Sequence, residues 1–348
     1  MYADRIEKYK LLEESFNGKI LSYITGDRVG FETQIEQDAI DLIIDHLDKI
    51  GVVERLLLYL YTRGGNTAVA WNIVNLLRMY CDELYIIVPH KAHSAGTLIS
   101  LGAEKIIMTK QATLSPIDPS IVTSLNPMIQ NGPVAQPFPV SVEAIQGFIE
   151  LAHEEFSVKE NEEAVSKLAD YVHPIVLGEA YRSRGQIKRL ARELLAYQSL
   201  DEKKVDALVD FLCSDSGSHD YTINRREAKD KWSLNAAKPT DEQYIIIKEV
   251  YEDFSQELGL RQALDPRRNP GAYAVRRGFI ESIYRGSDYF ITEGTIEAAV
   301  LPDGQEAVKS TIAYEGWRHD NEIAEIQEAI LTTERGEVQY EQDGDFKL

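Results

Sequence analysis

The first 110 residues alternate between runs with the period of a strand and runs with the period of a helix. Apolar runs predict strands at 18–25, 55–62, 83–89 and 104–109. The run at 55–62 is nearly continuous, as expected of a strand covered on both faces. Helical spacing occupies the intervals at 33–51, 67–80 and 94–102. This order predicts an α/β fold with a mostly parallel sheet and right-handed crossovers.

The rhythm breaks between Ser115 and Val140, where six of the 12 prolines of the chain gather. A loop of this length is usually a lid, a binding loop or a mobile segment. Helical spacing returns at 141–156, 161–172, 183–198 and 202–213, and 287–317 predicts a hairpin around Pro302-Asp303-Gly304. We predict a core at 1–175 that contains the 115–140 loop, a helical region at 176–286, and a β-hairpin with an acidic tail at 287–348.

Charge and composition exclude several classes of function. The net charge of −20 repels phosphate backbones, so nucleic acid is not an expected partner. Cys81 and Cys213 give no disulfide framework and suit a reducing compartment as buried free thiols. A charged N-terminal stretch and the lack of a bilayer-length apolar run predict a cytoplasmic protein with no membrane partner. Phosphate-loop, H-E-x-x-H, C-x-x-C and G-x-S-x-G patterns do not occur, so we expect no cofactor and no metal.

Two turns of small residues follow neighbouring predicted strands. Gly64-Gly65 ends the run at 55–62, and Ser94, with Ala95 behind it, follows the run at 83–89. Acyl transfer needs a nucleophile and two N–H groups that face the developing oxyanion, and ligands of open α/β sheets bind at the carboxyl ends of the strands. Each turn alone is also consistent with a tight turn or an ordinary helix cap. Their order and strand context together favour a catalytic site.

The stretch "LYLYTRGGNTAVAWNIVNLLR", with "VPHKAHSAGTLISLGAEKIIMTKQATLSPIDPS" after it, resembles the serine dehydrogenase proteinase family. This family is signal peptide peptidase A-like and lies in the Clp protease/crotonase superfamily. The resemblance is strongest over 55–120. It implies a Clp/crotonase-like spiral of ββα units with a helical and β-hairpin C-terminal appendage. It also implies Ser94 as nucleophile and an oxyanion hole from Gly64 or Gly65 with Ala95.

The general base departs from the pattern of the better-understood relatives. Asp118 falls near the place of the Clp-type histidine, and no lysine lies between Lys110 and Lys159. His173, beside Pro174 and after the proline-rich loop, is our first choice, although it is also consistent with a helix-terminal residue. Asp118 could orient the base or cap a turn. The other candidates are Lys159, Lys167, Lys188, His219, His90, Lys91 and His93.

We therefore predict a cytoplasmic serine peptidase that cleaves peptide bonds through an acyl-enzyme on Ser94. The resemblance implies a homo-oligomer, and a peptide or protein is the expected substrate. The chain contains no ATPase signature, so an unfoldase or activator would be a separate partner. Two alternatives stay open: a crotonase-like acyl-thioester enzyme, which would not need Ser94, and a catalytically silent scaffold or regulatory protein of the same fold.

Overall fold

The computed structural model describes residues 1–117, 120–131, 134–156, 161–215, 221–262, 270–300 and 306–320. Its main element is an eight-stranded sheet with the order β12-β5-β3-β2-β1-β13-β14-β15. Five strands run parallel: β1 (Lys19–Thr25), β2 (Val53–Tyr61), β3 (Cys81–Val88), β5 (Lys105–Met108) and β12 (Ala236–Ala237). Three more extend the sheet antiparallel: β13 (Gly271–Ser282), β14 (Gly286–Val300) and β15 (Glu306–Asp320).

A second, smaller sheet lies beside the carboxyl ends of the parallel strands. It consists of β4 (Lys91–Ala92), β6 (Thr113–Leu114) and β11 (Ile223–Asn224), and Thr62 joins it through a bridge to Ala92. A long strand, a short strand and a helix therefore follow one another, as in β3, β4 and α4 (Ala95–Leu101). This arrangement confirms the predicted fold of ββα units around a mostly parallel sheet.

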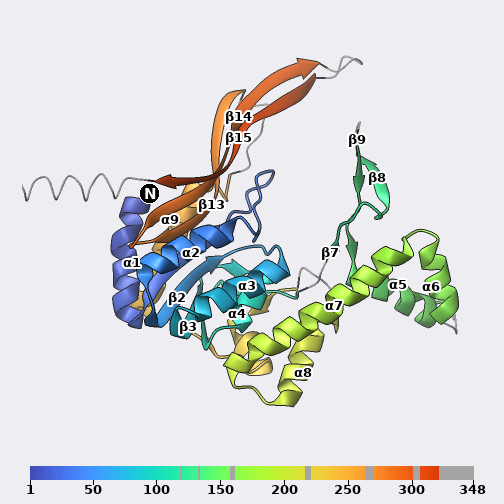
Figure 1. Ribbon diagram of the computed structural model, residues 1–348, viewed down its shortest axis with the longest axis horizontal. Helices are drawn as coiled ribbons and strands as arrows, with labels where there is room; N and C mark the ends of the chain where they lie inside the picture. Colours follow the sequence, from blue (N-terminus) through green and yellow to red (C-terminus); the bar gives the residue numbers. More distant parts are fainter. Residues whose placement is uncertain are drawn as a thin grey trace, which may run out of the picture.

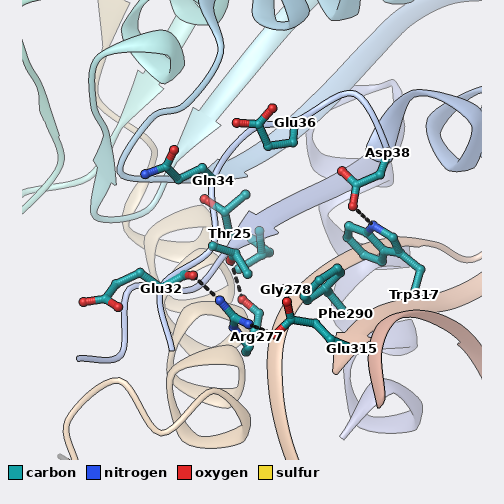
Figure 2. A pocket seen from close by; sticks show the side chains of 12 residues that line it. Thr25, Glu32, Gln34, Glu36, Asp38, Arg277, Gly278, Phe290, Glu315 and Trp317 are labelled. Atoms are coloured by element: carbon teal, nitrogen blue, oxygen red, sulfur yellow. Dashed lines mark hydrogen bonds and ion pairs between the residues drawn. The ribbon is translucent and has the colours of Figure 1, made fainter. Parts of the chain in front are cut away.

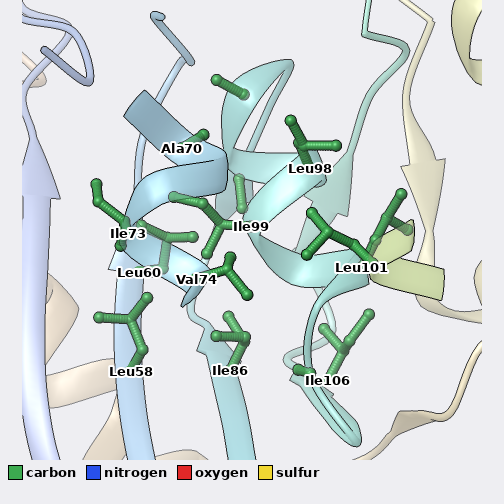
Figure 3. Packing of buried hydrophobic residues seen from close by; sticks show 14 of the residues in the cluster. Leu58, Leu60, Ala70, Ile73, Val74, Ile86, Leu98, Ile99, Leu101 and Ile106 are labelled. Atoms are coloured by element: carbon green, nitrogen blue, oxygen red, sulfur yellow. The ribbon is translucent and has the colours of Figure 1, made fainter. Parts of the chain in front are cut away.

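The parallel strands are covered on both faces, as the continuous apolar run of β2 predicts. Leu58 and Leu60 point into one core, and Tyr59 and Tyr61 point into the other, because successive side chains alternate across a strand. The first core includes residues of α2 (Ala39–Ile50), α3 (Thr67–Arg78), α4, α7 (Pro174–Leu195) and α8 (Glu202–Asp210). The second core includes residues of α1 (Tyr2–Phe16) and α9 (Asp241–Glu257). Figure 3 shows Leu58, Leu60 and Ile86 of the strands packed against Val74 and Ile99.

A buried charge network fastens α1 to β13. Arg5 is fully buried and donates from Nε and Nη2 to the two oxygens of Glu281, at 2.9 and 2.7 Å. Asp253 and Glu257 of α9 accept from its Nη1. A buried charge that loses its partner typically costs about 3–5 kcal/mol. The first helix is thus bound to a strand formed far later in the sequence.

The structure corrects several predicted boundaries. The helix predicted at 33–51 begins only at Ala39, and Ile35 is extended and bridged to Gly65. Residues 271–282, inside the range predicted to be helical, form β13. The boundaries 1–175, 176–286 and 287–348 stay a prediction as domain limits.

The 115–140 segment is more regular than a plain loop. It contains β7 (Ser120–Ile121), β8 (Met128–Asn131), β9 (Val134–Pro137) and β10 (Val140–Ser141), and β8 pairs with β9. Two helices follow, α5 (Val142–Glu154) and α6 (Asn161–Ala169). Figure 1 shows β8, β9, α5 and α6 standing away from the sheet, near the N-terminal end of α7. We call residues 120–181 the arm. The predicted hairpin is confirmed as β14 and β15, and its turn at Pro302 lies outside the described residues.

A buried histidine connects α2 to β13 and β14. His46 Nδ1 lies 2.7 Å from Ser282 Oγ, and its Nε2 lies 3.0 Å from Asp288 Oδ2. Burial lowers the pKa of His46 below its ordinary value, and the neighbouring Asp288 carboxylate does not restore it. The fold therefore holds this imidazole in its neutral form.

We expect the free energy of unfolding to fall as the pH drops below about 6.5, the ordinary pKa of histidine. The unfolded chain then binds a proton at His46 more readily than the folded chain does, so the slope is positive and at most about 1.4 kcal/mol per pH unit. Urea unfolding of wild type and His46→Gln across about pH 5–8 measures it. His319→Gln, on the exposed side of Asp288, is the control. An unchanged slope in His46→Gln would contradict the assignment.

Candidate functional site

The two small-residue turns meet at the carboxyl ends of β2 and β3. On one side, the Gly64-Gly65 turn pairs with the backbone of Ile35 through two hydrogen bonds. The N–H of Ile35 donates to the Gly64 carbonyl (2.9 Å), and the N–H of Asn66 donates to the Ile35 carbonyl (2.8 Å). On the other side, the N–H of His93 donates to the carbonyl of Thr62 at 3.1 Å. Asn66 then caps α3 by accepting from Ala68 N–H. The Gly-Gly turn is therefore fixed between two neighbouring backbones.

Glycine is required at both positions of this turn. A Cβ on Gly64 would lie 2.8 Å from Ser94 Cβ and 3.1 Å from the His93 carbonyl oxygen. A Cβ on Gly65 would lie 2.4 Å from the backbone N and O of Ile35. Both residues also have positive φ, 120° and 146°. Gly64 thus lies so close to Ser94 that a methyl group would not fit, and the same holds for Gly65 beside Ile35. The role of this turn as an oxyanion hole stays a prediction.

Ser94 has a strained backbone. Its φ is 51° and its ψ is −114°, whereas Asn17 and Ser199, which also have positive φ, have the ψ of ordinary left-handed caps, 56° and 39°. Such a conformation costs about 1–3 kcal/mol and persists only where its surroundings enforce it. Ser94 stands at the N-cap of α4, but its side chain makes no capping hydrogen bond. The hydroxyl is therefore available for chemistry.

A buried serine that the sequence reasoning missed holds this conformation. Ser115 Oγ accepts the N–H of Ser94 at 2.8 Å and donates to the carbonyl of Pro116 at 3.0 Å. The N–H of Ser115 in turn donates to Thr97 Oγ1, at 3.0 Å. Ser115 lies at the start of the predicted loop, where no motif marked it. We regard it as a positioning residue for Ser94.

Two backbone N–H groups beside Ser94 have no acceptor among the described residues. They belong to Gly65, just beyond the close contact, and to Ala95, the first residue of α4. The N–H of Gly64, by contrast, donates to Thr62 Oγ1 at 3.0 Å. The sequence did not decide which of the two glycines would donate to an oxyanion. Gly65 is the better candidate, because its N–H has no acceptor among the described residues, whereas Gly64 makes the close contact with Ser94.

The predicted base does not contact Ser94. His173 is exposed, and its Nδ1 accepts the N–H of Ile175 (3.2 Å) as the N-cap of α7. Figure 1 shows that end of α7 beside α5 and α6, away from α4. Asp118, Lys159 and His219 lie outside the described residues. Within the described part of the chain, Ser94 Oγ has no hydrogen-bond partner, and the role of His173 stays a prediction.

The remaining candidates are engaged elsewhere or have no role assigned by their contacts. His93 Nε2 bonds Thr113 Oγ1 (2.8 Å), and Lys188 is paired with Asp210 (2.7 Å). His90 stacks on Tyr251, and burial lowers its pKa. Lys167 lies on α6, and no contact among the described residues links it to the site.

Lys91 is paired with Asp27 at 2.6 Å. Burial acts to raise the pKa of Asp27, but the bonds from Lys91 and Tyr61 outweigh it and hold that pKa below its ordinary value. The ammonium group of Lys91 is thus engaged by Asp27 and makes no hydrogen bond to Ser94.

Comparison with known proteins finds a family whose model matches the part of the chain that contains the site. Residues 53–134 match the family model of the ClpP-like SDH-type serine proteinases. The matched segment contains Gly64, Gly65, Ser94 and Ala95. The predicted resemblance is thereby confirmed over these residues, and they match a family of serine proteinases.

Particular relatives match over parts of their length. The uncharacterized protein MJ0137 of Methanocaldococcus jannaschii is 28% identical over 202 residues, which is 58% of this chain and 60% of the relative. The uncharacterized protein MJ1495 of the same organism is 39% identical over 64 residues, 18% of this chain and 22% of the relative. The chain thus spans less than two thirds of either relative.

Two solved structures are also similar. A mutant of the 1510-N membrane-bound stomatin-specific protease is 18% identical, with a TM-score of 0.34, 70% of this chain covered and 86% of that one. ClpP1 from Listeria monocytogenes is 14% identical, with a TM-score of 0.34, 67% of this chain covered and 99% of that one. Among the described residues of our chain, no helix is long and apolar enough to cross a membrane, and no metal-binding group of His, Cys, Asp or Glu occurs.

We expect Gly64→Ala to destabilise the protein by more than the backbone conformation alone explains. Gly30 also has positive φ (83°), but an added Cβ there would meet nothing within 4 Å, so Gly30→Ala is the matched control. Gly30→Ala should cost about 1–2 kcal/mol. Gly64→Ala should cost about 1–3 kcal/mol more, because its methyl group collides with Ser94. Urea unfolding measures both, and equal losses would show that the contact is not tight.

Proposed function

We propose that the protein is a serine peptidase that cleaves peptide bonds through an acyl-enzyme on Ser94. The observation that supports this most directly is the contact between the Gly64-Gly65 turn and Ser94, with the N–H groups of Gly65 and Ala95 left without acceptors among the described residues beside it. Two such donors are the usual means of stabilising the oxyanion of acyl transfer.

The reaction would proceed in two steps. Ser94 Oγ attacks the carbonyl carbon of the peptide bond and transfers its proton to the base, while Gly65 and Ala95 donate to the oxyanion. The base then protonates the departing amine, and the C–N bond breaks to leave an ester on Ser94. A water molecule, deprotonated by the same base, cleaves the ester and restores the hydroxyl.

His173 and Asp118 are the proposed base and its orienting residue. For His173 this requires the N-terminal end of α7 to move toward α4, because the imidazole now caps α7. Such a movement would make activity depend on the position of the arm. A separate activator or unfoldase could supply it. The cytoplasmic setting is likewise our inference; it is supported by Cys81 and Cys213, which are buried and form no disulfide.

We expect a fluorophosphonate probe to add once to the wild-type protein and not to Ser94→Ala, because only an activated serine displaces its leaving group. Intact mass measures the adduct. Ser100→Ala, a buried serine on α4 that bonds the Gly96 carbonyl, is the control and should label like wild type.

His173→Asn should slow labelling by about 100-fold if His173 is the base, since general-base catalysis contributes about 10²–10⁴. It should leave labelling unchanged if the base lies elsewhere. No adduct in folded wild type would contradict the peptidase proposal and favour the scaffold alternative. Thioester turnover that survives Ser94→Ala would favour the crotonase-like alternative.

A homo-oligomer is also proposed, and the arm is its candidate contact. The arm exposes large apolar side chains on both its hairpin and its helices, where a monomer would normally bury them. They include Met128 (55% exposed), Phe138 (50%), Phe156 (70%) and Tyr181 (80%). Their concentration on one projecting segment supports an interface there.

We expect sedimentation velocity to give a species larger than a monomer for the wild type. Phe156→Ser with Tyr181→Ser should shift the protein toward the monomer, because the interface loses apolar area. Val29→Ser, at an equally exposed apolar side chain outside the arm (73% exposed), is the control. A monomeric wild type would refute the proposed assembly.

A further inference from the structure

A cavity of about 250 Å³ opens between the segment at 32–38 and strands β13 to β15. Figure 2 shows Gln34, Glu36 and Asp38 on one side of it and Phe290 and Trp317 on the other. Its volume lies just below the range of small-molecule pockets, about 300–1,000 Å³, and suits a single side chain. The mechanism proposed above does not use it.

The cavity adjoins the Ser94 site through two direct connections. Gln34 and Glu36 flank Ile35, whose backbone N–H and carbonyl hold the Gly64-Gly65 turn. Thr25, which lines the cavity, donates its hydroxyl to Thr62 Oγ1 at 2.7 Å, and that oxygen accepts the N–H of Gly64. A peptide bound at the Gly64-Gly65 turn would therefore lie next to a segment whose side chains line this cavity.

Most charged groups that line the cavity already have partners. Asp38 accepts the indole N–H of Trp317 at 2.8 Å. Glu315 accepts hydrogen bonds from Arg277 (2.6 Å) and from the hydroxyl of Thr292. The Glu315 carboxylate thus neutralises the guanidinium of Arg277. Glu32 accepts the N–H of Gly30 at 3.0 Å and lies 3.8 Å from Arg63.

Glu36 differs from these carboxylates. Among the described residues, its carboxylate has no hydrogen-bond donor and no ion-pair partner. Glu36 is exposed, and desolvation together with the nearby charge of Asp38 raises its pKa above the ordinary value. Among the described residues, no group of the protein neutralises its charge. A cation at this position would do so.

The opposite wall suits the same ligand. Phe290 and Trp317 pack edge to face, with ring centroids 5.5 Å apart. Aromatic faces attract ammonium and guanidinium groups, and Arg277 already lies over Phe290, at 5.5 Å from its centroid. A neutral apolar side chain would leave Glu36 without a partner. A second carboxylate would add to the acidic lining.

We propose that this cavity binds the side chain of an arginine or lysine in the substrate, with Glu36 as the specificity-determining residue. The inference rests on the proposed peptidase function and adds a substrate class to it. The cationic group enters between Glu36 and the aromatic wall, which places the peptide backbone along Ile35 and the Gly64-Gly65 turn. The enzyme then prefers peptides with a basic residue close to the bond that is cleaved.

The test separates binding from cleavage. Nα-acetyl-arginine methylamide and its norleucine counterpart are titrated by NMR into Ser94→Ala, a background that needs no catalysis. The arginine compound should bind, and the norleucine compound should bind at least about tenfold more weakly, because a charge-assisted contact is lost. Glu36→Gln in the same background should weaken arginine binding about tenfold and leave norleucine binding unchanged.

Asp41→Asn is the matched control, since this exposed carboxylate of α2 lies outside the cavity and its loss changes the net charge equally. In the Ser94→Ala background, equal binding of the two compounds, or an effect of Asp41→Asn as large as that of Glu36→Gln, would overturn the proposal.

Paired peptides that differ only in arginine or norleucine are then given to the wild type. Faster cleavage of the arginine peptide, reduced by Glu36→Gln, supports the substrate class. Cleavage without preference overturns the inference and leaves the peptidase proposal intact. A third outcome is that the arginine compound binds but the fluorophosphonate probe does not add to Ser94 of the wild type. That outcome supports a cavity for basic ligands and overturns the peptidase function.

Discussion

The site depends on one close approach between two backbones. Gly64 meets Ser94 at a distance that excludes even a methyl group, and Ile35 fixes the glycine turn from the other side. The strained φ and ψ of Ser94 are enforced by this contact and by the hydrogen bond to Ser115. The parallel strands bring the three segments together because their carboxyl ends share one edge of the sheet. The geometry of the site therefore depends on the packing of several strands and not on one turn alone.

Strand and helix periods predicted β1, β2, β3 and β5 and the place of the Gly-Gly and Ser94 turns, because both signals are local. They missed β12 and β13. Ile35 shows where local reasoning fails: its spacing fits a helix, yet its partner is Gly65 on the next ββα unit, and tertiary pairing overrides the pattern. Ser115 could not be found from the sequence, since it bonds Ser94, which only the fold brings near. The proposed role of Glu36 was equally hidden, since only the fold forms the cavity that it lines. His173 was singled out as a base, and in the structure it caps a helix.

The two proposals assign different tasks to adjacent regions. The Ser94 turn would perform the chemistry, which requires rigid donors and a strained nucleophile. The cavity beside Ile35 would select the substrate through Glu36, whose carboxylate has no partner among the described residues. The arm would hold copies together and could bring a base to the serine. On these proposals, the enzyme would stay inactive until assembly or a partner completes its site.

The position of β1 has a consequence for synthesis of the protein in the cell. β1 pairs on one side with β2, which follows it closely, and on the other with β13, whose Gly278 lies opposite Thr25 about 250 residues later. A ribosome needs on the order of 12 to 50 s to make that stretch. During this time β1 cannot form its hydrogen bonds to β13, and Arg5 cannot pair with Glu281. Nascent chains with an open strand edge are prone to pair with one another. The order of strands in this sheet thus leaves the growing polypeptide with an unpaired strand edge until β13 has been made.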